Sequence, residues 1–300
     1  MRKWFLALTF SMAAMAQSPA LQFPLWAPQG TAISPESLSV SVGGAKAAIL
    51  KIHAPADDLM LLVVLDLTDD LAAVQQARTA LAERLQMLPT NHFVGVLSAQ
   101  NGLRVLEDPT GDRKKTQAAM VSQTVGGRAG LLETIEDVAR IGSSIIAKSG
   151  VRVAVLYVTD SDINNYREAF NNPTINQSDN GDVSRRMDSL VRERISRTVN
   201  TLQKTQVPIF ISHLTYRTDQ LNVAYQTGLI SLASATGGTA VVARSISEIS
   251  STVNQTLDHI LGHYSVSVTL PDPHAKKVDL ALENSTGTGL DYRSSFVLGN

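Results

Sequence analysis

An unbroken run of apolar residues that ends in a carboxylate constrains the fold more than any other feature of this chain. Every residue from Leu59 to Leu65 is apolar, and Asp66 follows at once, ahead of Thr68 and Asp70. A strand without polar interruptions is expected to be covered on both faces, as in the sheet of an α/β protein. Buried charge is costly without partners, so acids at the end of such a strand must meet donors or a cation.

Strand and helix patterns alternate along the middle of the chain. Residues 71–87 have helical spacing, and two short apolar runs around Asn101-Gly102 predict a hairpin, so one strand runs antiparallel. The apolar positions that we expect on one side of this helix are Leu71, Val74, Leu81, Leu85 and Leu88. Further strands are expected at residues 151–158, 208–213 and 238–242. The alternation predicts right-handed crossovers and an α/β fold with a doubly wound, mostly parallel sheet, which is Rossmann-like.

The ends of the chain carry a period-two pattern instead, which is typical of strands with one wet face. We expect residues 35–56 and 263–300 to form a small β appendage built from both chain ends. The doubly wound domain, residues 57–262, is then inserted between its two parts.

The amino terminus predicts export from the cytoplasm. A basic start, a short apolar stretch and the small-residue pattern Ala14-Met15-Ala16 indicate a signal peptide of bacterial type over residues 1–16. Residues 17–34 are rich in Pro, Gln, Ser and Ala, so we expect a linker there. No second long apolar segment follows, which predicts a secreted or periplasmic protein without a membrane span.

Composition narrows the chemistry. The chain has no cysteine, which excludes disulfides and a thiol nucleophile. Its net charge is −1, so nothing electrostatic favours nucleic acid as a partner. His259 and His263 lie four residues apart on a predicted helix, but no third ligand accompanies them, so their spacing does not indicate a zinc site.

Two distant acids are predicted to meet where the sheet changes its winding direction. Ligands of open α/β sheets bind beyond the carboxyl ends of the strands at this reversal. The sequence places Asp66 and Asp160 there, with Asp70 in the first turn after Asp66. Crowded carboxylates repel one another and favour a cation, and oxygen-only ligands suit Mg²⁺, Ca²⁺ or Mn²⁺. Taken singly, Asp69 and Asp70 are also good helix caps.

These stretches resemble the metal-ion-dependent adhesion site of von Willebrand factor type A domains. The family pattern is strand-Asp-x-Ser-x-Ser, a Gly-Gly-Thr loop before a helix, and strand-Thr-Asp-Gly. It corresponds here to Asp66–Asp70, to Gly126-Gly127-Arg128-Ala129 and to Thr159-Asp160-Ser161. The β-flanked arrangement, with Tyr292-Arg293 near the end, is similar to secreted bacterial proteins that carry a domain of this type. The resemblance implies the fold, and its metal motif is degenerate.

The departures from the family motif leave two interpretations open. Thr68 keeps the hydroxyl of the first serine, Asp70 adds a charge at the second, and the loop threonine is missing. In one interpretation Asp66, Thr68, Asp70 and Asp160 hold a divalent cation. In the other, the guanidinium of Arg128 takes the place of the ion, since arginine pairs well with carboxylates.

The resemblance implies a binding protein rather than an enzyme. We expect it to recognise a protein partner of unknown identity through the acidic crevice. The alternatives are a metal-assisted hydrolase of phosphate esters, with Asp66 at the nucleophile position, and a structural module whose metal site has decayed. No group suited to serine catalysis accompanies Ser161.

Overall fold

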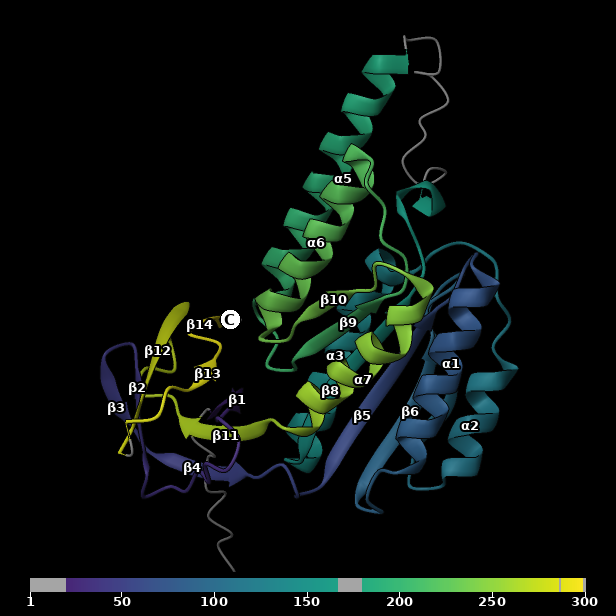
Figure 1. Cartoon of the computed structure of the whole chain (residues 1–300). Coiled ribbons are helices and arrows are strands. Elements are labelled where there is room, and N and C mark those ends of the chain that lie inside the picture. Colours follow the sequence, from purple (N-terminus) through teal and green to yellow (C-terminus); the bar gives the residue numbers. More distant parts are fainter. Residues whose placement is uncertain (1–19, 167–179, 286, 299–300) are drawn as a thin grey trace, which may run out of the picture.

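The computed structural model describes residues 20–166, 180–285 and 287–298. It shows two parts, a layered α/β domain and a β appendage (Figure 1). The predicted signal peptide, residues 1–16, lies outside the described residues. Within the described residues, no helix is both long and apolar enough to cross a bilayer.

The central domain confirms the predicted doubly wound sheet. Its strands lie in the order β10-β9-β8-β5-β6-β7, and each neighbouring pair is parallel except β6 with β7. The strands are β5 (Leu59–Asp66), β6 (His92–Ser98), β7 (Arg104–Thr110), β8 (Arg152–Thr159), β9 (Ile209–His213) and β10 (Ala240–Val242). The chain winds outward from β5 through β6, then returns to β8 on the other side, so the winding direction reverses between β5 and β8.

Helices cover both faces of this sheet, which explains why β5 and β8 are apolar throughout (Figure 1). The helices are α1 (Leu71–Gln86), α2 (Arg113–Ser122), α3 (Leu131–Ser149), α5 (Asn180–Leu202), α6 (Gln220–Thr236) and α7 (Ile249–Leu261), with short 3₁₀ turns η1 (Ile163–Tyr166) and η3 (Ile246–Glu248). One core contains α1, α2 and α7, and the other contains α3, α5 and α6. Leu71 departs from the prediction: it is the first residue of α1 and is 70% exposed.

The predicted hairpin is present and has a physical cause in its turn. Asn101 and Gly102 have φ angles of +57° and +106°, the left-handed region that Asn and Gly tolerate best. They reverse the chain between β6 and the antiparallel edge strand β7.

The appendage is a two-sheet sandwich built from both ends of the chain. One sheet has the order β13-β1-β11-β4 and the other β14-β12-β2-β3. The strands are β1 (Ala20–Trp26), β2 (Leu38–Val42), β3 (Ala45–Ala47), β4 (Ile49–His53), β11 (Tyr264–Thr269), β12 (Lys277–Asn284), β13 (Asp291–Tyr292) and β14 (Ser295–Val297). Alternate residues of both sheets, such as Phe23, Val40 and Phe296, form its core.

The prediction of a linker over residues 17–34 is wrong for residues 20–26. These residues form β1, which pairs along its length with β11, and Leu21, Phe23 and Leu25 are fully buried. Pro24 concealed the strand, because proline cannot donate to a sheet ladder and is rare inside strands. It is tolerated since β13 pairs only with Leu25 and Trp26, which leaves Pro24 at a locally free edge.

Candidate functional site

The two predicted acids meet at the reversal of the sheet. Asp66 is the last residue of β5 and lies opposite Thr159, the last residue of β8. The next residue, Asp160, donates its backbone N–H to the carbonyl of Asp66 at 3.4 Å. The predicted juxtaposition of the two acids is therefore confirmed, and what each carboxylate contacts decides what the site can do.

Asp66 is completely buried and accepts four hydrogen bonds. The backbone N–H groups of Gly130 and Leu131 donate to it at 2.9 and 3.2 Å. The hydroxyls of Thr159 and Ser161 donate at 3.1 and 3.2 Å. Gly130 and Leu131 begin α3, so the carboxylate occupies the positive end of that helix.

This approach requires a glycine at position 130. A Cβ there would lie 1.8 Å from the carbonyl oxygen of Ala99, so only glycine lets the start of α3 reach the end of β5. The pKa of Asp66 is nonetheless raised to about 6, because burial outweighs the four donors.

Asp160 is held in a nest of backbone donors. One of its oxygens accepts from the N–H and the hydroxyl of Thr68, at 2.6 and 3.1 Å. The other accepts from the N–H groups of Asp69 and Asp70, at 2.9 and 2.8 Å. Three successive N–H groups ahead of α1 therefore surround one carboxylate, an arrangement that suits an anion.

The remaining predicted site residues have local roles. Asp70 is the N-cap of α1, and its side chain accepts from the N–H groups of Ala72 and Ala73. Asp69 is exposed. Arg128 is exposed too, and no carboxylate among the described residues lies within ion-pair distance of it. Backbone N–H groups contact both acids in this arrangement, and the interpretation with Arg128 in the place of an ion stays a prediction.

The donor set does not fit a divalent cation in this arrangement. A carboxylate has about four lone-pair positions, and both Asp66 and Asp160 use four on N–H and O–H donors. Over the part of the chain that the structure describes, no group of three His, Asp or Glu side chains could hold a metal. An ion at Asp66, Thr68, Asp70 and Asp160 would have to displace several of these donors, and this site stays a prediction.

Apolar side chains are exposed around the acids, at the same rim. Leu71 starts α1, Val121 lies in the last turn of α2, and Ile246 starts η3; they are 70%, 68% and 52% exposed. Tyr216, in the loop after β9, is 46% exposed. Hydrogen bonds connect α1 with the residue after α2 and with α7: the Arg78 side chain of α1 donates to the carbonyl of Gln123, and Gln76 of α1 donates to Ser250 of α7 at 2.8 Å. We call Leu71, Val121, Tyr216 and Ile246 the apolar rim.

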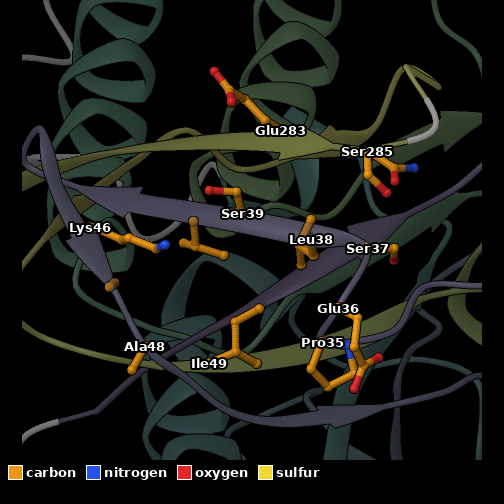
Figure 2. Close-up of a pocket in the computed structure, with 13 residues that line it drawn as sticks. Pro35, Glu36, Ser37, Leu38, Ser39, Lys46, Ala48, Ile49, Glu283 and Ser285 are labelled. Atoms are coloured by element: carbon orange, nitrogen blue, oxygen red, sulfur yellow. The ribbon is translucent and has the colours of Figure 1, made fainter.

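A separate groove of about 620 Å³ lies on the appendage, between β2, β3 and β4 (Figure 2). Leu38 and Ile49, one from each sheet, are seen on its apolar floor, whereas Glu283 points away from it. Its charged side chains do not converge on one point, so the groove does not indicate a ligand.

Sequence reasoning missed the donors at the acid site. Ser161 was set aside for catalysis, yet its hydroxyl donates to Asp66 and lies 3.1 Å from the Tyr225 hydroxyl. Gly130 directly follows the loop residues Gly126 to Ala129, and the motif comparison gives it no role. A small residue directly before a helix, following a strand-Asp pattern, is the signal that would have found it.

The comparisons with known proteins concern the fold. No protein-family profile matches the chain, and no curated protein matches it. Solved structures do match: a von Willebrand factor type A protein from Catenulispora acidiphila has 10% identity and a TM-score of 0.47, over 95% of this chain and 75% of that one. The vWF domain of the type V pili tip protein Mfa5 from Porphyromonas gingivalis has 10% identity and a TM-score of 0.47, over 68% and 95%. Proximal thread matrix protein 1 from the mussel byssus, with a zinc-occupied MIDAS motif, has 12% identity and a TM-score of 0.46, over 72% and 48%.

The strand order, the reversal between β5 and β8 and the antiparallel edge strand β7 define the class of the central domain. Its fold is the doubly wound, mostly parallel sheet with one antiparallel edge strand that the resemblance to von Willebrand factor type A domains implied. This particular chain carries that domain between the two halves of a β sandwich.

Proposed function

We propose that this chain is a secreted or periplasmic binding protein that recognises a protein partner through the apolar rim and has no enzymatic activity of its own. The observation that carries the proposal is the exposure of Leu71, Val121, Tyr216 and Ile246, which all belong to segments at the carboxyl end of the sheet. Apolar patches inside a polar surround are typical of protein interfaces.

The buried acids order loops at this end of the sheet, and Asp160 supports the proposal most directly because it holds the loop just before Leu71. Asp160 ties the loop before α1 to the end of β8, and Asp66 ties the start of α3 to the end of β5. A contact surface that is already ordered loses less conformational entropy on binding. The acids therefore act on the partner through the loops that they hold, rather than through direct contact.

The rim is tested by capture of partners from the bacterial envelope with the mature chain as bait. Replacing both Leu71 and Ile246 by Ser should weaken binding of the captured protein at least tenfold, about 1.4 kcal/mol or more, because truncated interface anchors often cost this much. Leu50→Ser is the matched control, since Leu50 is also exposed, at 54%, but lies on β4 of the appendage. An equal loss of affinity in the double variant and in Leu50→Ser would argue against the apolar rim as the binding surface.

The divalent-cation site and the hydrolase are alternatives that the same protein can test. Calorimetric titration with Mg²⁺ or Mn²⁺ should give no saturable heat if the backbone donors replace the ion. Saturable binding of the cation that is abolished by Asp160→Ala would support the metal site instead. An aryl phosphate assay tests the hydrolase, and we expect no turnover, since the Asp66 carboxylate is buried beneath four donors.

A further inference from the structure

The junction between the two parts of the molecule gathers four of the six histidines of the chain. We define the junction by the two crossings of the chain, residues 53–58 and 261–264, which connect the appendage to the central domain. His53 ends β4, His92 begins β6, and His259 and His263 lie in the last turn of α7 and just after it. His53, His92 and His263 are buried, so their charge state matters to the packing around them.

Arg152 forms hydrogen bonds to both crossings. It begins β8, is fully buried and points its guanidinium at backbone carbonyls alone. It donates to Pro55 and Asp57 of the first crossing at 2.6 and 2.9 Å. It also donates to Leu261 and His263 of the second crossing at 3.4 and 2.8 Å.

The histidines sit around this buried cation with few charges to balance them. Burial lowers the pKa of His53, His92 and His263, and the charge of Arg152 lowers all three further. The other cations that act on these three are Lys51 at His53, Arg113 at His92 and His259 at His263. The opposing acids are Asp57 at His53 and Asp58 at His92, while Asp291 acts on His259. Of these, Asp57 comes closest, with 3.8 Å between its carboxylate and the Nδ1 of His53.

His53 and His263 also contact backbone carbonyls at the junction, each through a ring N–H that donates in the neutral and in the charged form, whereas neither ring nitrogen of His92 has a hydrogen-bond partner among the described residues. His53 Nε2 bonds the carbonyl of Gly150 at 2.5 Å, and His263 Nδ1 bonds that of Ile260 at 2.5 Å. The His259 ring stacks on Trp26 of β1 at 4.4 Å, and the indole N–H donates to the carbonyl of His259 at 2.8 Å. The appendage therefore rests on uncharged histidines next to a permanent positive charge.

We propose that this junction is an acid-released latch, in which protonation of His53, His92 and His263 beside Arg152 separates the appendage from the central domain while both stay folded. A second contact stays in place, because it contains no histidine. Arg293 of the appendage donates to the carbonyls of Thr205 and Gln203 after α5 and lies 4.1 Å from the centre of the Phe296 ring. The appendage then pivots about Arg293 instead of detaching.

The direction of the response follows from the sign of the shifts. A histidine whose folded pKa lies below its unfolded value of 6.5 contributes stability above pH 6.5 and loses it as the pH falls toward the folded pKa, which is about 3 for His263. Arg152 keeps its charge throughout, with a pKa of about 10. Acidification therefore adds positive charge beside a cation that cannot give up its own.

The chain lacks cysteine, so a single pair of spin labels can report on the latch. Lys46→Cys on β3 and Glu83→Cys on α1 place one label on each part, at exposed positions of regular elements. Electron–electron distance measurements on the full mature chain should give one narrow distance at neutral pH and a broad or longer one at about pH 5. Circular dichroism at the same pH values checks that both parts keep their secondary structure.

The variants replace imidazoles by groups that cannot titrate. His53→Gln, His92→Leu and His263→Asn together should keep the narrow distance at about pH 5, whereas His274→Gln, at an exposed position outside the junction, should open like the parent protein. If the triple variant does not fold, His263→Asn alone should move the opening to lower pH. A narrow distance in the parent at every pH, an unchanged opening in the variants, or opening only together with loss of secondary structure would each overturn the latch.

Discussion

The two ends of the central sheet bury charges of opposite sign and neutralise them in the same way. At the carboxyl ends of the strands, Asp66 and Asp160 accept from N–H groups at the starts of α3 and α1. At the amino ends, Arg152 donates to carbonyls, including that of Leu261 at the end of α7. Backbone groups supply partners in both cases: N–H groups at helix starts for the acids, and for Arg152 the carbonyl of Leu261 at a helix end together with three carbonyls of the crossings.

The comparison shows how backbone groups can balance the charge at each end. In a doubly wound sheet the helices start at the carboxyl ends of the strands and finish at their amino ends, so N–H donors gather at one end and carbonyls at the other. Anions are stabilised at the first and cations at the second. Burial makes the two ends respond to acid in opposite directions, because it raises the pKa of Asp66 and lowers the pKa values of the junction histidines.

The largest effect is expected at the amino end. Arg152→Met should lower the free energy of unfolding by about 3–5 kcal/mol, because four backbone carbonyls lose a charged donor that is itself fully buried. Urea unfolding at neutral pH measures this. Arg140→Met is the control, since Arg140 is exposed and pairs only with Asp137 on its own helix; a loss there as large as that of Arg152→Met would undo the argument.

The sequence predicted the scaffold well and the partners of the charges poorly. Apolar runs, helical spacing and the Asn-Gly turn are local patterns, so they located β5, α1 and the hairpin, and the order of the strands brought Asp66 to Asp160. The donors could not be predicted in this way. They are backbone N–H groups, which every sequence supplies, and their positions depend on the finished fold.

The amino end was harder still to predict. Arg152 is one charged residue at the start of an apolar strand, and the carbonyls it contacts come from segments about a hundred residues away on either side. The pattern gave no reason to connect it with His53 or His263. The strand β1 was missed for a different reason, because Pro24 broke a pattern that tertiary pairing with β11 restores.

The second prediction uses the opposite response of the carboxyl end. The pKa of Asp66 is raised from 3.8 to about 6, so its folded form binds a proton more readily than the unfolded chain. This contribution to stability is full below pH 3.8 and is lost as the pH rises through 6. Relative to Asp66→Asn, which does not titrate, the parent should gain up to about 3 kcal/mol between pH 7 and pH 4. Chemical unfolding of both proteins across this range measures it, and a constant difference would show that Asp66 stays charged.

The third prediction concerns the nest around Asp160. Asp160→Asn should cost about 2 kcal/mol at neutral pH, because the amide NH₂ would face N–H donors that now meet an oxygen. Asp69→Asn is the neighbouring control and should change stability by less than about 0.5 kcal/mol, as expected for an exposed side chain. Thermal melts of the two variants side by side give the comparison. If both lose the same amount, the nest does not stabilise the loop before α1.

The smallest effect is expected from divalent cations, and it separates a nest of backbone donors from a metal site at the same residues. Ligand that binds only the folded state raises the melting temperature in proportion to the logarithm of its concentration over Kd. With all four acceptor positions of Asp66 and of Asp160 occupied by protein donors, millimolar Mg²⁺ should shift the melting temperature by less than about 1 °C. EDTA should change nothing either. The opposite outcome is a melting temperature that rises with Mg²⁺, falls back with EDTA and does not rise in Asp160→Asn. It would mean that an ion replaces the N–H groups of the loop before α1 as the partner of Asp160. Backbone groups alone would then balance the buried charge only at the arginine end of the sheet.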